Sequence, residues 1–130
     1  MVELIMAISK KQREVLRMKF GGKCAYCGCE LPEKGWHADH AEAVLRNIGK
    51  GYAMDRPELD CIENMMPACQ PCNLYKSACS IEQFRERVAT QLDVTRRASR
   101  SYRFAEAFGL VTPTGNSVIF WFEKYQDIKS

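Results

Sequence analysis

The fold of this chain depends on two short stretches, Cys24-Ala25-Tyr26-Cys27 and Cys69-Gln70-Pro71-Cys72, which are separated by 41 residues. Each stretch is a Cys-x-x-Cys knuckle, and two such knuckles can close one tetrahedral thiolate site. Four thiolates suit Zn²⁺, and the metal would hold together a domain whose central loop has little else to fix it. The sequence therefore predicts a structural zinc site with the ligands Cys24, Cys27, Cys69 and Cys72.

The cysteine count leaves some alternatives open. The chain has seven cysteines, an odd number, so complete intramolecular disulfide pairing is impossible. The knuckles could instead be buried free thiols or a redox pair, although neither lies in a βαβ pattern. The other three cysteines are expected to be small buried or half-exposed residues, one of which could replace a presumed ligand: Cys29, Cys61 and Cys79.

Length and composition limit the possible classes of protein. A chain of 130 residues that is 46% apolar has the size of one compact domain. Its net charge of +3 is too small for a purely electrostatic binder. The longest uncharged apolar stretches, Leu4–Ile8 and Val118–Phe122, are far shorter than the roughly 18 residues that a membrane span requires. Because Glu3 stands where a signal peptide needs positive charge, we expect a cytoplasmic protein.

Charge is distributed in blocks along the chain. The net charge is +4 over residues 1–23, −3 over 24–79, +3 over 80–103 and −1 over 104–130. Two basic segments therefore flank an acidic, cysteine-rich centre, and their lysines and arginines could neutralise the phosphates of a nucleic acid.

Helix signals occur on both sides of this centre. Ser9 and Gln12 form a capping-box pattern that predicts a helix ending at Gly21-Gly22. This helix is expected to face a core with four apolar residues, Val15, Leu16, Met18 and Phe20. Three further helical segments are predicted, the first opening at Asn73: Asn73–Ala78, Ile81–Arg97 and Tyr102–Phe108.

Other segments favour strands, turns and loops. A strand that opens into a loop is expected over Gly35–Leu45, and an exposed loop over residues 46–60. Thr112–Asn116 is a predicted turn. Ser117–Phe122 is rich in β-branched and aromatic residues, and we expect it to be a buried strand.

Both histidines of the chain occur in Trp36-His37-Ala38-Asp39-His40. An aspartate supplies a hard oxygen for a divalent cation, and a neutral histidine can accept a proton from water near neutral pH. Neighbours on an ideal strand point to opposite faces, so Asp39 and His40 can act together only at a bend or a strand end. The segment that follows them is therefore expected to be irregular.

Two asparagines bracket the second knuckle, in the stretch Glu63-Asn64-Met65-Met66-Pro67-Ala68 and directly after Cys72 at Asn73. The chain thus has a first Cys-x-x-Cys, an Asp-His pair, an asparagine ahead of the second Cys-x-x-Cys, and an asparagine just after it. In this order the residues resemble an HNH endonuclease. The resemblance covers roughly residues 9–125, and the tail is similar to that of small stand-alone phage HNH proteins.

The resemblance implies roles for four residues. Asp39 and Asn73 would hold one divalent cation, His40 would activate water, and Asn64 would brace the loop through main-chain hydrogen bonds. The reaction would be hydrolysis of a DNA phosphodiester bond, with the cation neutralising charge on the phosphate and on the leaving oxygen. Oxygen-donating ligands favour Mg²⁺ or Mn²⁺ there, so the zinc would be purely structural.

Several residues are candidate substrate contacts. His37 could be a third metal ligand, a phosphate contact or a structural hydrogen-bonding residue, and we favour the structural role. Lys76 lies one helical turn after Asn73 and could reach a phosphate or be a solvated lysine. Phosphate contacts are also expected from the arginines of the second basic segment, chiefly Arg96, Arg97 and Arg100, with Arg103 beside them.

The predicted fold class is α+β. It consists of a ββα-metal (HNH) core over about residues 20–80, stapled by the four-cysteine zinc site. Flanking N- and C-terminal helices and a short C-terminal strand complete it, the extension covering about residues 81–125 within a single domain of residues 1–130.

Three functions are compatible with these patterns. The leading prediction is a metal-dependent DNA endonuclease, monomeric or weakly dimeric, acting in the cytoplasm or, for a phage protein, in that of its host. The alternative is a zinc-stapled nucleic-acid-binding accessory protein with a vestigial nuclease site. A zinc-ribbon interaction module would explain the cysteines but not Asp39, His40, Asn64 and Asn73.

Overall fold

The computed structural model describes residues 8–42 and 61–129. They belong to two compact units, and each is described here by itself. The knuckle unit runs up to Ile81 and resumes at Phe120, and the hairpin unit is Glu82–Ile119. The prediction of a single domain over residues 1–130 stays a prediction. The expected loop over residues 46–60 lies outside the described residues.

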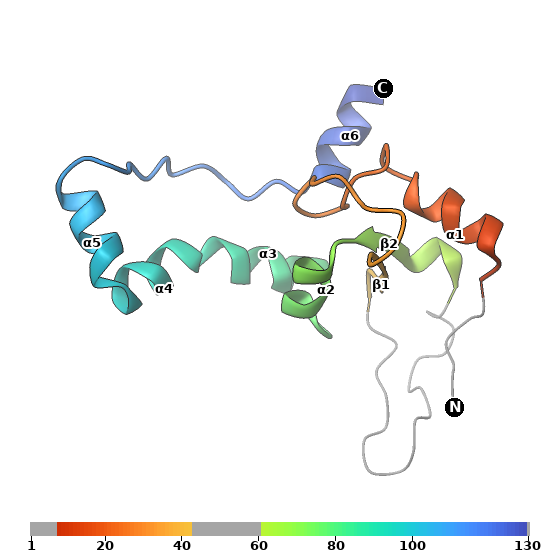
Figure 1. Cartoon of the computed structure of the whole chain (residues 1–130), viewed down its shortest axis with the longest axis horizontal. Coiled ribbons are helices and arrows are strands. Elements are labelled where there is room, and N and C mark those ends of the chain that lie inside the picture. Colours follow the sequence, from red (N-terminus) through yellow and green to blue (C-terminus); the bar gives the residue numbers. More distant parts are fainter. Residues whose placement is uncertain (1–7, 43–60, 130) are drawn as a thin grey trace, which may run out of the picture. The chain divides into compact units, whose positions relative to one another are not determined.

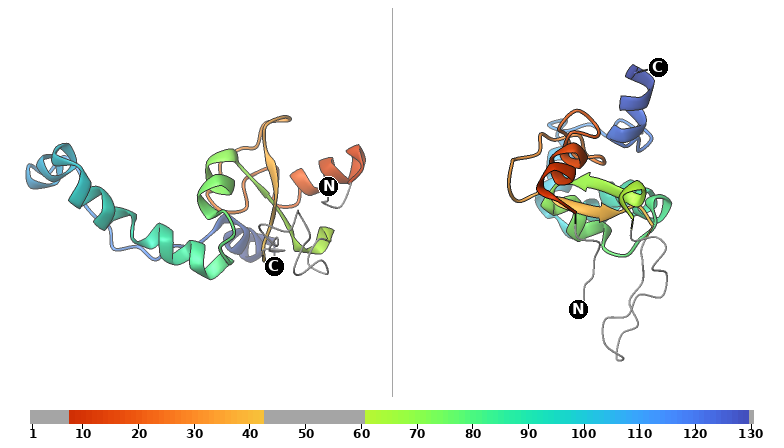
Figure 2. Two further views of the ribbon diagram at one scale, coloured as in Figure 1. Left: turned by 90° about the horizontal axis from the view of Figure 1, so that it is seen from below. Right: turned by 90° about the vertical axis from the view of Figure 1, so that its right-hand side faces the viewer.

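The knuckle unit contains a sheet of two antiparallel strands, β1 (His37–His40) and β2 (Met65–Ala68), which lie side by side in Figure 2. The pairing register sets Asp39 opposite Met66 and His40 opposite Met65. A short 3-10 turn, η2 (Ile62–Asn64), leads into β2. All four residues of β2 are buried, so this strand runs through the core of the unit. The strand expected within Gly35–Leu45 is present but covers only His37–His40, and residues 43–45 lie outside the described residues.

Helix α2 (Gln70–Lys76) follows β2 directly, with Cys69 at its N-cap and Pro71 in its first turn (Figure 1). Proline is favoured there because the first N–H groups of a helix have no partner within it. The expectation that Asn73 opens this helix is wrong. The helix begins at Gln70, so Cys72 lies in its first turn and Asn73 in its middle.

Helix α1 (Lys10–Arg17) begins with the predicted capping box. The Gln12 N–H donates to Ser9 Oγ over 3.0 Å, and the Ser9 N–H donates to Gln12 Oε1 over 2.9 Å. The core-facing residues are only partly as predicted. Leu16 and Phe20 are buried, whereas Val15 and Met18 remain 65% and 48% exposed. The helix is one turn shorter than expected, because its C-cap is already Met18.

The first knuckle forms a tight turn at the centre of the unit. The Cys24 N–H donates to the Cys29 carbonyl over 2.8 Å, and Lys23 bridges to Glu30. Gly28 has a φ of 81°, and a Cβ there would lie 3.4 Å from the Trp121 side chain. The turn is joined to the sheet, because the Ala25 N–H donates to the Pro67 carbonyl over 2.8 Å.

The C-terminal segment of the knuckle unit corrects the prediction of a buried strand over Ser117–Phe122. Residues 117–120 are extended without pairing in a sheet, and helix α6 (Trp121–Lys129) starts directly after them. The Phe120 N–H donates to Glu123 Oε1 over 2.8 Å, which closes the helix start. The Trp121 and Phe122 N–H groups donate to the carbonyls of Tyr26 and Ala25. The hydrogen bonds to the first knuckle and the start of α6 therefore override the strand preference of this segment.

Three short helices build the hairpin unit: α3 (Ile81–Ala89, whose first residue belongs to the knuckle unit), α4 (Gln91–Ala98) and α5 (Arg100–Ala107). The single helix expected over Ile81–Arg97 is wrong, because it is divided at Thr90. The Thr90 hydroxyl donates to the Arg87 carbonyl over 2.8 Å, which competes with the regular helical pattern. Ser99 caps α5 by accepting from the Tyr102 N–H over 3.0 Å. The helix predicted to end at Gly109 is confirmed.

The overall class is α+β, a mixture of helices with one small two-stranded antiparallel sheet. Within residues 8–42 and 61–129, the helices are all too short or too polar to cross a membrane.

Candidate metal centre and histidine site

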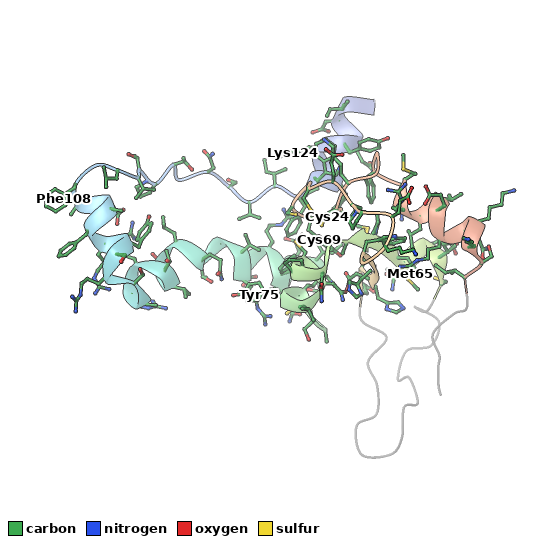
Figure 3. The ribbon with its side chains drawn as sticks, in the orientation of Figure 1. Cys24, Met65, Cys69, Tyr75, Phe108 and Lys124 are labelled. Atoms are coloured by element: carbon green, nitrogen blue, oxygen red, sulfur yellow. The ribbon has the colours of Figure 1, made fainter. Side chains whose placement is uncertain are left out.

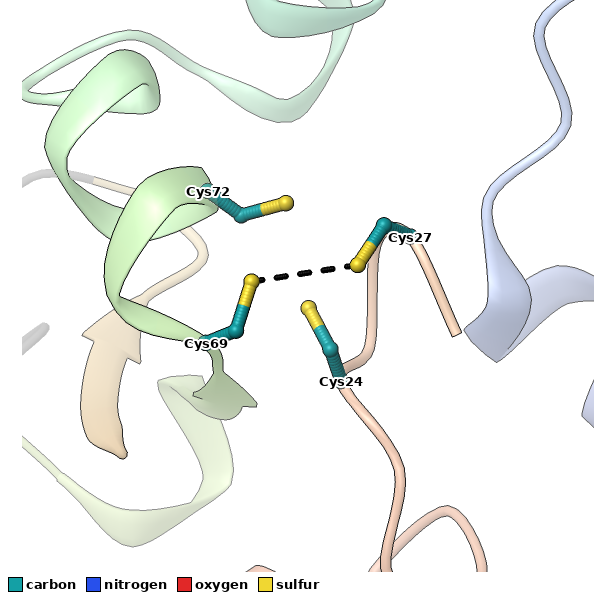
Figure 4. Close-up of side chains that lie close together, drawn as sticks. All are labelled: Cys24, Cys27, Cys69 and Cys72. Carbon is teal, nitrogen blue, oxygen red and sulfur yellow. Dashed lines mark hydrogen bonds between the residues drawn. The ribbon is translucent and has the colours of Figure 1, made fainter. Parts of the chain in front are cut away.

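Four cysteines gather at one point of the knuckle unit. The Sγ atoms of Cys24, Cys27, Cys69 and Cys72 all lie within 4.8 Å of one another. Two come from the first knuckle and two from the N-terminal end of α2, and the side chains point toward a common centre (Figure 4). The predicted meeting of the two knuckles is confirmed.

The spacing of the sulfur atoms fits a tetrahedral metal. A zinc site with Zn–S bonds of about 2.3 Å separates its sulfurs by about 3.8 Å. The Cys27 and Cys69 sulfurs are 3.8 Å apart. The cluster is compatible with a structural metal such as zinc, held by four thiolates.

The electrostatics of the cluster also favour a cation. A hydrogen bond from the Cys72 thiol lowers the pKa of Cys24 to about 4, and the same bond raises the pKa of Cys72. Each thiolate that forms thus makes the next ionisation harder, because like charges would accumulate in one place. A divalent metal removes this conflict and allows all four sulfurs to ionise.

The three other cysteines lie outside the four-sulfur group. Cys29 is exposed, while Cys61 and Cys79 are half-buried. Burial of its thiol and the neighbouring Cys27 and Cys69 raise the pKa of Cys29 to about 12. Cys29 is not among the four sulfurs that lie within 4.8 Å of one another, so the geometry favours the four knuckle cysteines as ligands.

Asp39 is the most strongly engaged residue of the histidine segment. Its carboxylate is only 6% exposed, and its Oδ2 atom accepts from the Tyr26 hydroxyl over 2.6 Å. The Lys76 Nζ lies 3.1 Å from the same oxygen. The Asp39 carboxylate on β1 thus joins the first knuckle, through Tyr26, to helix α2, through Lys76.

Tyr26 and Lys76 stabilise the ionised form of Asp39, which burial disfavours. Desolvation raises the pKa of Asp39, although Tyr26 and Lys76 each act to lower it. The pKa of Tyr26 is raised by burial and by the Asp39 charge, so Tyr26 stays protonated and remains a donor. Tyr26 was missed in the sequence. Its position between the two cysteines of the first knuckle was the sequence signal that could have identified it.

The expectations for Lys76 require a correction. A phosphate contact or a solvated side chain both require an accessible ammonium group, but Lys76 is 0% exposed. Besides pairing with Asp39, its Nζ donates to the His40 carbonyl over 2.8 Å. The long aliphatic stem lies in the core, and the ammonium is fixed by partners on β1.

His40 lies at the end of β1, and the chain beyond it is held by Asn64. The Ala41 N–H donates to the Asn64 carbonyl over 2.8 Å. The Glu42 N–H donates to Asn64 Oδ1 over 3.1 Å, and Asn64 Nδ2 donates back to the Glu42 carbonyl over 2.8 Å. The main-chain hydrogen bonds expected of Asn64 are present, and they fix the two residues that follow His40.

Asn73 and His37 are the two remaining predicted site residues of the knuckle unit, and both are half-buried. Asn73 is half-buried on α2, three residues before Lys76 and therefore on the same face of the helix. His37 is half-buried at the start of β1, opposite Ala68. Its imidazole makes no hydrogen bond within the described part of the chain, so the structural role that we favoured has no partner there.

The basic residues of the first segment are mostly used by the fold. The Arg13 guanidinium stacks 4.1 Å from the Trp36 ring and donates to the Trp36 carbonyl. Lys19 Nζ donates to the Met65 carbonyl over 3.0 Å. Arg17 donates to the Leu31 carbonyl, and its pairing with Glu14 adds a local contact. These side chains tie α1 to the rest of the knuckle unit.

The predicted arginines belong to the hairpin unit. Arg96 is paired with both carboxylate oxygens of Glu106, at 2.9 and 2.6 Å. Its guanidinium is thus neutralised within the hairpin, which does not favour the expected phosphate contact. Arg97 and Arg100 are exposed.

Comparisons with known proteins do not identify a relative. No family model matches the chain, and neither the curated proteins nor the solved structures contain a match.

Proposed function

We propose that this protein is a metal-dependent DNA endonuclease of the HNH type, with His40 as the general base. The observation that supports this most is the hydrogen-bonded frame around His40. The Lys76 Nζ donates to the His40 carbonyl, and Asn64 fixes the next two residues through three hydrogen bonds. The main chain is thus held at His40 and directly after it, which gives this residue a defined position at the end of β1.

The order of the elements adds support. The antiparallel pair β1 and β2 followed directly by α2 is a ββα arrangement, and the resemblance to HNH endonucleases implies that order. In this ββα arrangement, Asp39 and His40 lie on the first strand and Asn73 lies on the helix. In the knuckle unit, Lys76 connects that helix to Asp39.

In the proposed reaction, the His40 imidazole takes a proton from a water molecule, which then attacks the phosphorus of a DNA phosphodiester. The Lys76 bond to the His40 carbonyl and the Asn64 bracing hold the main chain that carries the imidazole, so little backbone reorganisation is needed during the proton transfer. The bond from phosphorus to the 3′ oxygen breaks and that oxygen takes a proton from solvent water, leaving 5′-phosphate and 3′-hydroxyl ends.

Asp39 and Asn73 would hold the divalent cation of this site. Both contacts of Asp39 are made by its Oδ2 atom, so Oδ1 accepts no hydrogen bond from the described residues. A carboxylate oxygen and an amide oxygen are hard ligands, which suit Mg²⁺ or Mn²⁺. When bound, the cation would neutralise negative charge on the phosphate and on the leaving oxygen.

Plasmid nicking tests this proposal. Zinc-loaded protein is incubated with supercoiled plasmid and Mg²⁺, Mn²⁺ or no added divalent metal, and the open-circular and linear forms are quantified. We expect open circles to form only with added metal and not with His40→Ala. Thr112→Ala, an exposed position of the hairpin unit, is purified in parallel and should cut like the wild type. Equal cutting by His40→Ala would show a contaminating nuclease and overturn the proposal.

A second candidate function is a zinc-stapled nucleic-acid-binding accessory protein with a vestigial nuclease site. The Lys76–Asp39 pair favours it, because an ammonium already compensates the carboxylate that a cation would use. Titration of Mn²⁺ into zinc-loaded protein separates the two functions. Binding that is lost in Asp39→Asn and Asn73→Ala supports the nuclease, whereas DNA binding without Mn²⁺ binding or cutting supports the accessory protein.

A further inference from the structure

Helices α4 and α5 present an exposed surface that the proposed nuclease site does not use. We call it the arginine–phenylalanine surface, and it consists of Arg97, Arg100, Arg103, Phe104 and Phe108. The two phenylalanines are 60% and 77% exposed, unusually high values for such apolar side chains. Figure 3 shows Phe108 at the C-terminal end of α5. Exposed aromatic groups gathered in one place indicate a binding surface.

The arginines of this surface are not compensated by carboxylates of the hairpin. Between Gln91 and Phe108 the chain has two acidic residues, Asp93 and Glu106, against four arginines. Both acids pair with Arg96. Arg97 and Arg100 make no ion pair with a described residue, and Arg103 donates to the carbonyls of Arg96 and Arg97. The surface therefore carries positive charge that is available to an anionic partner.

The aromatic and basic groups share one row of α5. Arg100, Phe104 and Phe108 are spaced by four residues, so they follow one another along the same face of the helix. The Phe104 and Phe108 rings contact each other edge-on, with centroids 6.3 Å apart. The row thus offers a guanidinium followed by two aromatic rings.

From this row we infer that the α4–α5 hairpin is a binding site for single-stranded nucleic acid, with bases stacking on Phe104 and Phe108 and phosphates contacting Arg97 and Arg100. Aromatic rings beside positive charge are the combination that unpaired nucleotides require, since each base has an apolar face and each phosphate a negative charge. In duplex DNA the base faces are covered by their neighbours, so the phenylalanines would gain nothing from it.

A membrane surface fits this row less well. An interfacial helix separates a broad apolar face from its charged face. Here Arg100 lies on the same row as the phenylalanines, so insertion of the rings would carry its guanidinium toward the acyl chains. Phosphate contact and base stacking instead use both kinds of side chain from the same side.

Fluorescence anisotropy with labelled oligo(dT), in buffer without divalent metal, tests the inference on the zinc-loaded full chain. We expect tighter binding of oligo(dT) than of a duplex of equal length. The double variant Phe104→Ala/Phe108→Ala should weaken oligo(dT) binding by about tenfold or more, because stacking contributes strongly per base. Ile128→Ala, another exposed apolar side chain, should change nothing.

Two further variants test the chemistry of the contact. Phe104→Trp should retain binding and Phe104→Leu should lose it, since only the former keeps an aromatic face. Arg97→Gln/Arg100→Gln should make the logarithmic dependence of affinity on salt shallower by about 1.4, or 0.7 for each lost phosphate contact on a single strand. Lys124→Gln is the matched control for an exposed cation.

Several outcomes would overturn the inference. They are equal affinity of wild type and Phe104→Ala/Phe108→Ala for oligo(dT), full binding by Phe104→Leu, and phenylalanine-dependent binding to anionic vesicles without binding to oligo(dT).

The binding site does not depend on the nuclease proposal. Loss of plasmid cutting in His40→Ala and loss of oligo(dT) binding in the phenylalanine variants are separate measurements, and either can fail alone.

Discussion

The knuckle unit and the hairpin unit differ in where several of their charged side chains lie. In the knuckle unit, Lys76 is fully buried between Asp39 and the His40 carbonyl, and Arg13 lies against Trp36. In the hairpin unit, Arg97 and Arg100 are exposed beside two uncovered phenylalanines. Charges that are fixed by the chain organise a site in advance, whereas charges left in solvent are available to a partner.

The two units also differ in the sequence separation of their contacts. The Trp121 indole N–H donates to the Phe20 carbonyl, 101 residues away, and Lys76 contacts a strand 36 residues before it. In the hairpin unit, the Arg96–Glu106 pair spans 10 residues and the bond from the Arg85 guanidinium to the Val118 carbonyl spans 33. Closing a long loop costs entropy, so the knuckle unit, which closes the longer loop, gains more from a strong crosslink. The metal supplies that crosslink in our interpretation.

Removal of the metal should have the largest effect. Cys72→Ser or excess chelator should unfold the knuckle unit, because structural zinc contributes roughly 10–16 kcal/mol of apparent binding free energy in zinc-finger peptides. Both tryptophans, Trp36 and Trp121, belong to this unit, so their fluorescence reports on it alone. Cys79→Ser, outside the cluster, should leave the emission spectrum native. A native spectrum in metal-free protein would contradict the crosslink.

Replacement of Lys76 should have the next largest effect. Lys76→Met leaves an ionised Asp39 buried without its counter-charge, which typically costs about 3–5 kcal/mol. Urea denaturation at neutral pH would measure the loss. Lys124→Met makes the same change at an exposed position and should keep the wild-type midpoint. Adding Asp39→Asn to Lys76→Met should recover part of the loss, and equal midpoints for all variants would show that the pair is unimportant.

Asn64→Ala should destabilise the knuckle unit more moderately. It removes the two side-chain hydrogen bonds to the main chain of residue 42, each contributing about 0.5–1.5 kcal/mol. Zinc content should remain one ion per chain by metal analysis, while plasmid cutting falls much more than stability. Asn116→Ala is the control in the exposed segment after α5. Cutting that falls only in proportion to the folded fraction would argue against a role for Asn64 in orienting His40.

The smallest effect is expected in the hairpin unit, at Glu106. The Arg96 guanidinium lowers the pKa of this carboxyl below its usual range. A carboxyl whose pKa is lowered by folding adds stability above its unfolded pKa of roughly 4.3, and this is lost as the pH falls through the lower folded pKa. The wild type should therefore be slightly more helical than Glu106→Gln at neutral pH, and the difference should close in acid.

Far-ultraviolet circular dichroism would follow this difference across the pH range. Glu86→Gln, at an exposed position on α3, is the control and should match the wild type throughout. The effect is small because an ion pair near the surface is screened by solvent. A pH-independent difference would show that Glu106 acts through packing rather than charge.

The sequence allowed the four-cysteine cluster and the main-chain hydrogen bonds of Asn64 to be predicted. In each Cys-x-x-Cys knuckle the two cysteines are three positions apart, close enough to bind one metal, and the four sulfurs do meet. The Ser9–Gln12 capping box is also local, because both partners lie within one helical turn. Asn64 was located through the resemblance of the motif, and its hydrogen bonds to residue 42 are present. The proposed catalytic roles of Asp39, His40 and Asn73 stay predictions.

Other features could not be read from the sequence because they depend on distant partners. Trp121 and Phe122 have strand-like neighbours, yet their N–H groups donate to the first knuckle, and the Phe120 N–H donates to Glu123 where helix α6 begins. Val15 and Met18 follow helical periodicity but remain outside the core, because α1 is covered mainly on the side of Leu16.

The sequence by itself determined which residue types were available: four paired thiols, one Asp-His pair and two blocks of positive charge. Only the tertiary structure decided which of these charged side chains form ion pairs within the chain. In the sequence, Lys76 and Arg96 cannot be distinguished from solvated basic residues. In the structure, Lys76 pairs with Asp39 and Arg96 pairs with Glu106. The physical reason is that ion pairing acts over a few ångströms in space, a distance that separation along the chain does not specify.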